Sequence, residues 1–267
     1  MNNIAIAKET VAITKARKYE KNGVTVSLPE DMAFDEVYCI TPEEGAAAVG
    51  IFLPQDAPLC RIEVTPEDSF EAARRMGDAL VMNFANAHCP GGGFLMGANA
   101  QEEALCRCST LYASLTANAA KAMYFYNNTH ISRVESDHML LSPEVCIFRD
   151  ASCELLDTPA RTAVITVPAP NRYGAALLAS KSVIAETFQR RIRIMLAMAA
   201  RHGYRKLVLG AWGCGAFGNK PQDVSNHFRQ VLIDERYGTA FDEVCFAVYG
   251  KEDGRNITAF RETFAQG

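Results

Sequence analysis

The hydrophobic positions of this chain predict several strands that are covered on both faces. Four segments are apolar without strict alternation: DALVMNFAN (78–86), TAVITVPAP (162–170), KLVLGAW (206–212) and EVCFAVYG (243–250). Such runs are typical of strands buried between two layers. A shorter segment, VTVSL (24–28), alternates and predicts a strand with one exposed face.

Helical segments separate these strands. Residues 3–20 contain no Gly or Pro and stop before Asn22-Gly23, which predicts a helix with a C-terminal stop. After a predicted strand that begins at residue 62, Thr65 and Pro66 are interpreted as the N-cap and first residue of a helix that Gly77 ends. Residues 180–203 predict a long helix that leads directly into the strand at 206, and residues 256–267 predict a last helix.

Helices that alternate with buried strands indicate an α/β protein with a mixed or parallel sheet sandwiched between helices. The 267 residues contain no internal repeat and no Pro- or Ser-rich linker, so we expect one domain over 1–267. Residues 1–60 are expected to form an N-terminal extension, with a helix, packed on that domain.

Charge and cysteine usage narrow the function class. The net charge is −4 and the pI about 5.8, so no global basic surface indicates DNA, RNA or an anionic membrane as partner. No apolar run approaches the roughly 18 residues of a membrane span, and no secretion signal is recognisable at the N-terminus. Nine cysteines without repeating spacing favour reduced thiols and a cytoplasmic location.

The first candidate site is a glycine loop that follows the strand ending at Asn86. Gly91, Gly92 and Gly93 allow positive φ and a close approach of backbone to a ligand. A flexible hinge is the alternative interpretation. Ligands of open α/β sheets bind at the carboxyl ends of strands, which favours ligand contact.

Two adjacent acids follow this loop at the start of a helix. Asn99 is interpreted as the N-cap and Glu102 as a capping-box acid, with a helix whose apolar face includes Leu105 and continues to Leu115. Adjacent helical residues point about 100° apart, so Glu103 is expected to face the crevice at the end of the strand. The helix dipole favours the charged form of an acid at this position, whereas a neighbouring carboxylate favours its protonated form. An acid under both influences is suited to proton transfer.

A second glycine loop, GAWGCGAFGNKP (210–221), follows another predicted buried strand. Gly213-x-Gly215-x-x-Gly218 resembles a dinucleotide fingerprint, but too little chain follows it for a dehydrogenase, and position 238 is Gly rather than an acid. Free N–H groups in such a loop can still cradle a pyrophosphate. Phe217 is expected either to contact a ligand sugar or to pack against the following helix.

Taken together, these motifs resemble the poly(ADP-ribose) glycohydrolases, and more closely their bacterial type, which has a macrodomain fold. NFAN (83–86) resembles the asparagine-ending strand of macrodomains, and Gly91-Gly92-Gly93 followed by seven residues and Gln101-Glu102-Glu103 matches the GGG-x(6–8)-QEE motif of this family.

The resemblance implies roles for individual residues. Glu103 matches the catalytic general acid/base, and Glu102 matches the neighbour that contacts ribose hydroxyls. The residues expected to bind substrate are Asn86, Gly91, Gly92, Gly93, Gln101, Gly213, Cys214, Gly215, Ala216, Phe217 and Gly218. Among them, Asn86 and the first glycine turn would orient the distal ribose, and Gly215–Phe217 would hold the diphosphate.

The implied reaction is hydrolysis of the ribose–ribose O-glycosidic bond of poly(ADP-ribose), with ADP-ribose as product and no metal or redox cofactor. ADP-ribosylated proteins would carry the substrate. Two alternatives remain open at this point: a macrodomain that binds ADP-ribose without cleaving it, and a hydrolase that removes single ADP-ribose units from proteins.

Other reactive residues are interpreted as structural. Cys106 and Cys108 would point about 200° apart on a helix, which disfavours a zinc site, and Cys214 is expected to pack in its loop. His130 and His138 are expected in a solvated connection. Arg190, Arg191 and Arg193 are expected on a solvated helix face, whereas Met195 and Met198 are expected in the core.

Overall fold

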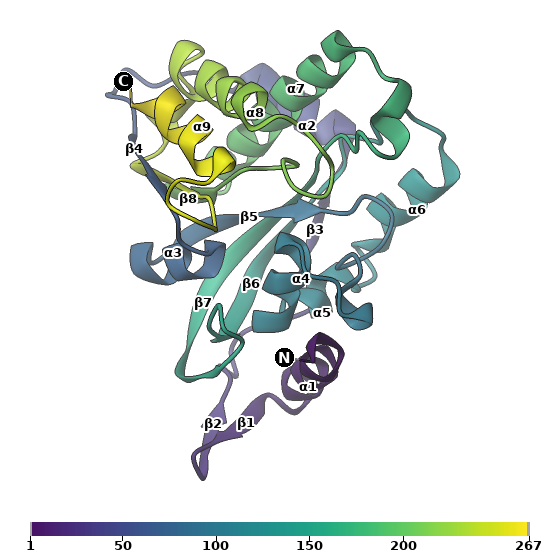
Figure 1. Ribbon diagram of the computed structural model, residues 1–267, viewed down its shortest axis with the longest axis vertical. Coiled ribbons are helices and arrows are strands. Elements are labelled where there is room, and N and C mark those ends of the chain that lie inside the picture. Colours follow the sequence, from purple (N-terminus) through teal and green to yellow (C-terminus); the bar gives the residue numbers. More distant parts are fainter. Residues whose placement is uncertain (1, 266–267) are drawn as a thin grey trace.

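A seven-stranded mixed sheet forms the centre of the molecule (Figure 1). The structure is a computed structural model and describes residues 2–265. In spatial order the strands are β3 (Tyr38–Ile40), β6 (Met139–Arg149), β7 (Leu155–Pro168), β5 (Ala79–Ala85), β8 (Lys206–Leu209), β9 (Glu243–Ala247) and β4 (Arg61–Thr65). The five strands from β7 to β4 are parallel, and β3, β6 and β7 pair antiparallel. The prediction of a mixed α/β sheet is therefore confirmed.

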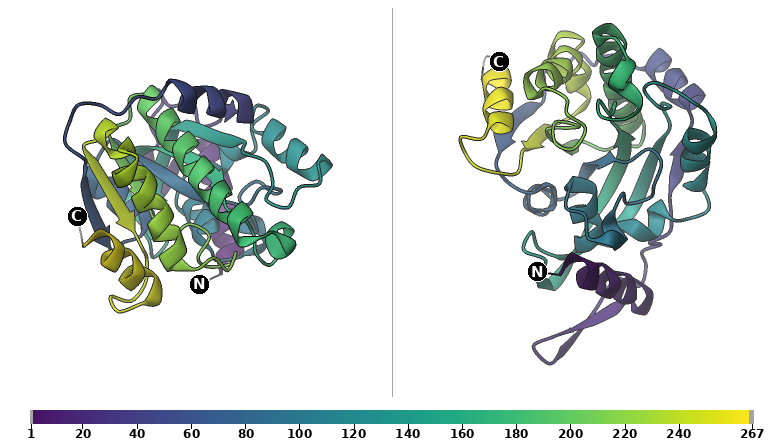
Figure 2. Two further views of the ribbon diagram at one scale, coloured as in Figure 1. Left: turned by 90° about the horizontal axis from the view of Figure 1, so that it is seen from above. Right: turned by 45° about the vertical axis from the view of Figure 1, so that its right-hand side comes forward.

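Helices cover both faces of this sheet, as Figure 2 shows. Alternate residues of β5 point to opposite sides: Leu80 and Met82 belong to one core cluster and Val81 to the other. The first face carries α2 (Pro42–Ile51), α7 (Lys181–Arg201), α8 (Pro221–Arg229) and α9 (Arg255–Phe264). The second face carries α3 (Ser69–Met76), α4 (Gln101–Cys108), α5 (Leu111–Leu115) and α6 (Lys121–Thr129). Both faces of β5 are thus buried, as its apolar sequence predicts.

The N-terminal segment forms a small unit at one end of the sheet (Figure 1). It contains α1 (Asn3–Ala16) and the hairpin of β1 (Lys18–Lys21) and β2 (Val24–Ser27). The predicted helix over 3–20 is too long, because Arg17 adopts a left-handed φ of 56° and ends α1. The hydroxyl of Thr10 donates to the carbonyl oxygen of Arg107 at 2.7 Å, which ties α1 to α4.

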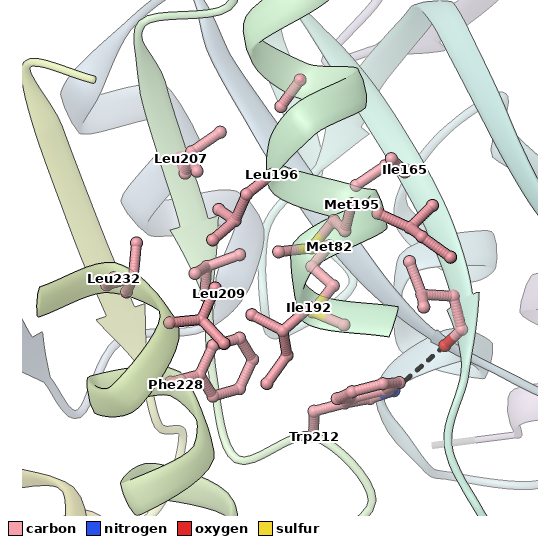
Figure 3. Close-up of a cluster of buried hydrophobic side chains, with 14 of the residues drawn as sticks. Met82, Ile165, Ile192, Met195, Leu196, Leu207, Leu209, Trp212, Phe228 and Leu232 are labelled. Carbon is pink, nitrogen blue, oxygen red and sulfur yellow. Dashed lines mark hydrogen bonds between the residues drawn. The ribbon is translucent and has the colours of Figure 1, made fainter. Parts of the chain in front are cut away.

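A buried tryptophan fixes the loop that follows β8. Trp212 is fully buried, and its Nε1 donates to the carbonyl oxygen of Val167 at 3.0 Å (Figure 3). Phe188 of α7 meets it edge-on, with ring centroids 4.8 Å apart. The predicted core positions Met195 and Met198 are confirmed, with 1% and 5% exposure. The second glycine loop therefore starts from a rigid anchor.

Two predicted helix boundaries are wrong. Asp68, not Thr65, is the N-cap of α3, and its side chain accepts the N–H groups of Phe70 and Glu71. The helix therefore begins at Ser69 rather than at Pro66. The helix expected to continue to 115 is broken, because Ser109 makes a β-bridge with Ile147 between α4 and α5. The last helix is confirmed over Arg255–Phe264, and residues 266–267 of that prediction lie outside the described residues.

The expectation that Arg190, Arg191 and Arg193 lie on a solvated helix face is wrong for Arg191. Arg191 is fully buried, and its Nε donates to Oδ1 of Asp137 at 2.9 Å. Burial raises the pKa of Asp137, but the hydrogen bond from Arg190 and the charge of Arg191 outweigh it and hold that pKa below its usual range. His138, also expected in solvent, is 7% exposed, and burial lowers its pKa.

Between residues 2 and 265, no helix is long and apolar enough to cross a membrane.

Candidate active site

The first turn of α4 is attached to the carboxyl end of β5 by side-chain hydrogen bonds. Gln101 accepts the N–H of Phe84 at 2.9 Å and donates to the carbonyl oxygen of Met82 at 2.9 Å. Glu102 accepts the N–H of Asn86 at 2.8 Å through Oε2. These two side chains bind the edge of β5 beyond Val81, where its pairing with β8 has ended. They fix the acidic pair against the central strand.

Glu102 is held in a setting that disfavours its charge. Its side chain is 3% exposed, and burial raises its pKa to about 8, although the N–H of Asn86 and the amide of Asn83 lower it. The charge of Glu103 raises it further. Asn83 is fully buried and donates to Oε1 of Glu102 at 3.4 Å. A carboxyl with this pKa is protonated at neutral pH and can donate a hydrogen bond.

Glu103 carries the capping role that the sequence analysis gave to Glu102. Its Oε2 accepts the N–H of Ala100, the N-cap residue, at 3.0 Å, and its Oε1 accepts the N–H of Gly93 at 2.9 Å. Asn99 is not the cap; it accepts a hydrogen bond from Arg107. The correction follows from a helix that starts one residue later than expected. Each oxygen of Glu103 keeps a second lone pair for a ligand.

The first glycine loop folds around this carboxylate. Gly91 and Gly92 have φ of 67° and 55°, which other residues rarely adopt. A Cβ atom at Gly92 would overlap Oε1 of Glu103, and one at Gly93 would lie 2.7 Å from Cβ of Ala98. The loop opens with an Asx turn, in which Oδ1 of Asn86 accepts the N–H of residue 88 at 2.8 Å. The amide nitrogen of Asn86 stays available to a ligand.

The second glycine loop presents free backbone donors. Among the described residues, the N–H groups of Gly213, Gly215, Ala216 and Phe217 donate to no protein acceptor. The loop is closed from behind by Asn219, whose amide donates to the carbonyl oxygens of Gly213 at 3.1 Å and of the residue at position 170 at 2.9 Å. Successive free amides of this kind bind phosphate oxygens.

The acidic pair and the second glycine loop border one cavity of about 930 Å³. Of the residues expected at the site, those that line it are Asn86, Gln101, Glu102, Glu103, Gly213, Gly215, Ala216 and Phe217. Gly91, Gly92 and Gly93 lie outside the lining, the last two of them against Glu103, and Cys214 and Gly218 also lie outside it. Phe217 both lines the cavity and packs against the core beside it, so its two expected roles are compatible. The volume is in the range of small-molecule sites.

Comparisons with known proteins agree with this geometry. The family model for the microbial-type PARG catalytic domain, where PARG denotes poly(ADP-ribose) glycohydrolase, matches residues 7–150, which is more than half of the chain. The chain belongs to the microbial-type PARG family. No curated protein matches it significantly.

Solved structures of bacterial PARGs resemble it over nearly its whole length. The PARG of Thermomonospora curvata is 39% identical with a TM-score of 0.91, covering 98% of this chain and 99% of that one. A structure of the same enzyme bound to the inhibitor ADP-HPD gives 39% identity, a TM-score of 0.89 and the same coverage. The Deinococcus radiodurans PARG in complex with ADP-ribose is 37% identical with a TM-score of 0.82, covering 90% of this chain and 99% of that one. This PARG is accordingly a glycoside hydrolase that acts on poly(ADP-ribose).

The PARG site includes residues that the sequence analysis did not identify. Asn83 is a polar residue inside an otherwise apolar strand. This break in the hydrophobic pattern could have indicated a residue of the site. Arg107 is 2% exposed and lines the cavity, but nothing in its helical position distinguishes it. Ser152 and Cys153 reach the cavity from the β6–β7 turn, which no motif marks.

Cys106 and Cys214 both pack against the hydrophobic core clusters. Within residues 2–265, no three His, Cys, Asp or Glu side chains are grouped to hold a metal ion. Cys106 is fully buried within α4, and Cys214 packs against the core, where burial raises its pKa to about 12. These thiols fit the structural roles expected of them.

Proposed function

We propose that this chain hydrolyses the ribose–ribose bond of poly(ADP-ribose) with Glu103 as general acid and base. The observation that supports this proposal is the position of the Glu103 carboxylate, fixed by two backbone N–H groups at the wall of the cavity that also holds the second glycine loop. Positioning of this kind supplies much of the rate in glycoside hydrolysis.

The second glycine loop would bind the diphosphate of the terminal ADP-ribose unit. Gly213, Gly215 and Ala216 line the cavity, and among the described residues their N–H groups donate to no protein acceptor. This device needs no lysine and suits a protein of net negative charge. Val248 and Tyr249, at the end of β9, line the same cavity and would form the apolar wall for the adenine base.

Glu102 and Glu103 would have different roles at the ribose. Asn86 and Glu102 would hold the ribose hydroxyls, with Glu102 as a neutral hydrogen-bond donor at neutral pH. Glu103 would protonate the oxygen that leaves C1″ as the bond breaks through an oxocarbenium-like state. The resulting carboxylate would take a proton from the water that attacks C1″. The products are ADP-ribose and a polymer shortened at the cut.

The proposal extends to the setting of the reaction. Residues 1–267 would act as one domain, because the strands of the sheet come from positions 38 to 247 and the N-terminal unit contacts α4. Poly(ADP-ribose) on modified proteins would be the substrate, ADP-ribose would bind as product, and neither nucleic acid nor a membrane is a proposed partner. The nine cysteines are all free, which supports a reducing, cytoplasmic location.

A paired digestion tests this function. The chain is incubated with labelled poly(ADP-ribose) and, separately, with a protein carrying single ADP-ribose units, and free ADP-ribose is followed by chromatography. We expect release from the polymer and none from the mono-modified protein. Binding of ADP-ribose without release from either substrate would support a non-catalytic reader, and release from the mono-modified protein alone would contradict the proposed substrate.

A further inference from the structure

Two cysteine residues line the same cavity as the second glycine loop. Cys108 is the last residue of α4, and Cys153 lies in the β6–β7 turn; both line the cavity. Sγ of Cys108 donates to the carbonyl oxygen of Asp150 at 3.3 Å, and the backbone N–H of Cys153 donates to the same oxygen at 2.8 Å. A shared acceptor therefore holds one thiol and the backbone of the other residue together. The turn lies near α1 in Figures 1 and 2.

Two buried arginines surround Cys153. Arg107 and Arg149 are 2% and 4% exposed, and Nη1 of Arg149 donates to the carbonyl oxygen of Cys153 at 2.8 Å. Among the described residues, Nε of each arginine has no hydrogen-bond partner. Among the described residues, Glu9 is the only acid that pairs with either arginine, and it accepts from Arg149 at 2.7 Å. Buried, partly unsatisfied guanidinium groups favour an anion at this place.

The two thiols differ in their proton affinity. Interaction with Cys108 and the charges of Arg107 and Arg149 lower the pKa of Cys153 below its usual range, against the effect of burial. Interaction with Cys153, burial and the nearby charge of Asp68 raise the pKa of Cys108 well above its usual range. Cys153 is half-buried, whereas Cys108 is 6% exposed. One sulfur is therefore a reachable thiolate and the other a protected thiol.

We propose that Cys153 and Cys108 form a hydroperoxide-sensitive thiol pair in the cavity wall, with Cys153 oxidised first and Cys108 closing a disulfide. The Cys153 thiolate attacks one oxygen of hydrogen peroxide, which breaks the O–O bond, gives a sulfenic acid at Cys153 and releases hydroxide. Cys108 then loses its proton and attacks the Cys153 sulfur, forming the S–S bond and releasing water. In total, one thiolate, one thiol and one hydrogen peroxide become one disulfide, one water and one hydroxide.

Oxidation would alter the cavity wall in two ways. It removes a negative sulfur from beside Arg107 and Arg149, so the local charge becomes more positive by one. It also links the C-terminal end of α4, the helix that carries Glu103, to the β6–β7 turn. The proposal stands on the thiol geometry and does not depend on the roles of Glu102 and Glu103.

Peptide mapping of the full chain tests the pair. The reduced protein is treated with limiting hydrogen peroxide, the remaining thiols are alkylated, and peptides are analysed by mass spectrometry without reduction. We expect a Cys108–Cys153 cross-linked peptide as the first product. Cys108→Ser should instead stop at a sulfenic acid on Cys153 that dimedone traps, and Cys153→Ser should give neither product.

Cys89→Ser is the matched control. Cys89 is more exposed than Cys153 and also close to the site, but burial and the charges of Glu102 and Glu103 raise its pKa. This variant should form the cross-link at the wild-type rate. First oxidation at Cys89, or the absence of the cross-link while other cysteines are oxidised, would overturn the proposal.

A second measurement uses the unmodified chain and needs no variant to fold. The rate of alkylation of each cysteine by iodoacetamide is measured as a function of pH. Cys153 should reach half of its maximal rate at a clearly lower pH than Cys89, because the pKa of Cys153 is lowered and that of Cys89 is raised. Equal midpoints for the two residues would contradict the proposed order of reaction.

Discussion

Gly92 and Glu103 lie so close together that the carboxylate fills the space that a side chain at position 92 would need. The next residue, Gly93, donates its N–H to the same oxygen of Glu103 at 2.9 Å. The first glycine loop is therefore the support of the acidic residue, and its backbone freedom serves the catalytic group directly. This relationship joins the two halves of the GGG and QEE motif.

Gly92→Ala should lower turnover at least ~10-fold, because the added methyl group displaces Glu103 and misplacement of a catalytic group is costly. The left-handed backbone should also cost about 1 kcal/mol of stability. Turnover on labelled polymer and thermal unfolding measure the two effects. Gly50→Ala is the control, since a Cβ there meets nothing within 4 Å and its φ is not left-handed. Wild-type turnover in Gly92→Ala would show that the contact is unimportant.

The free energy of unfolding should fall as pH rises from about 4.5 to about 8. The pKa of Glu102 is raised in the folded chain, so the folded state binds more protons than the unfolded state in this window. The slope is on the order of 1 kcal/mol per pH unit while the folded state stays protonated and the unfolded state is ionised. Above about 8 both states are ionised and the loss is complete.

Glu102→Gln removes this titration and keeps the shape of the side chain. Chemical denaturation from pH 4 to 9 should show a flatter profile in the variant than in the wild type. The difference between the two profiles isolates Glu102 from other titrating groups. Parallel profiles would mean that Glu102 is charged in the folded chain.

Gly215→Glu should weaken ADP-ribose binding at least ~10-fold, because a carboxylate would enter the space proposed for the diphosphate. The fold should be kept, since a Cβ at this position meets nothing within 4 Å. Gly215→Gln adds similar bulk without charge and should weaken binding less. Calorimetry with ADP-ribose measures both, and equal affinity of wild type and Gly215→Glu would exclude a phosphate at this loop.

Asp137→Asn should destabilise the fold by about 3 kcal/mol, because it leaves the buried cation of Arg191 without its counter-charge. Arg191 has no exposed side-chain surface, and Asp137 has 15%. Asp242→Asn is the control: its pair with Arg205 is exposed, so its loss should change the stability much less. Thermal unfolding measures both. A similar small effect in the two variants would argue against an essential buried pair.

Local patterns predicted the central strands and both glycine loops, because burial on two faces and left-handed backbone each leave a signature within a few residues. The run 78–86 became β5, and Gly213 adopts a positive φ in the second loop. The QEE motif was informative for the same reason. These features depend on short stretches of chain.

The errors arose where distant segments decide the outcome. The N-cap lies at Ala100, rather than at Asn99, because Arg107 binds Asn99 and the Gly93 N–H binds Glu103. The break at Ser109 depends on its bridge to Ile147, which is far along the chain. The burial of Arg191 likewise needs Asp137 from another segment, and no helical period shows that partner.

The most direct test of the central claim is polymer hydrolysis by Glu103→Gln, measured together with its affinity for ADP-ribose. The amide can still accept the Gly93 N–H but cannot donate the catalytic proton, so turnover should fall at least ~10²-fold while ADP-ribose affinity is largely kept. Turnover near the wild-type value, with intact ADP-ribose binding, would contradict the assignment of Glu103 as the general acid and base.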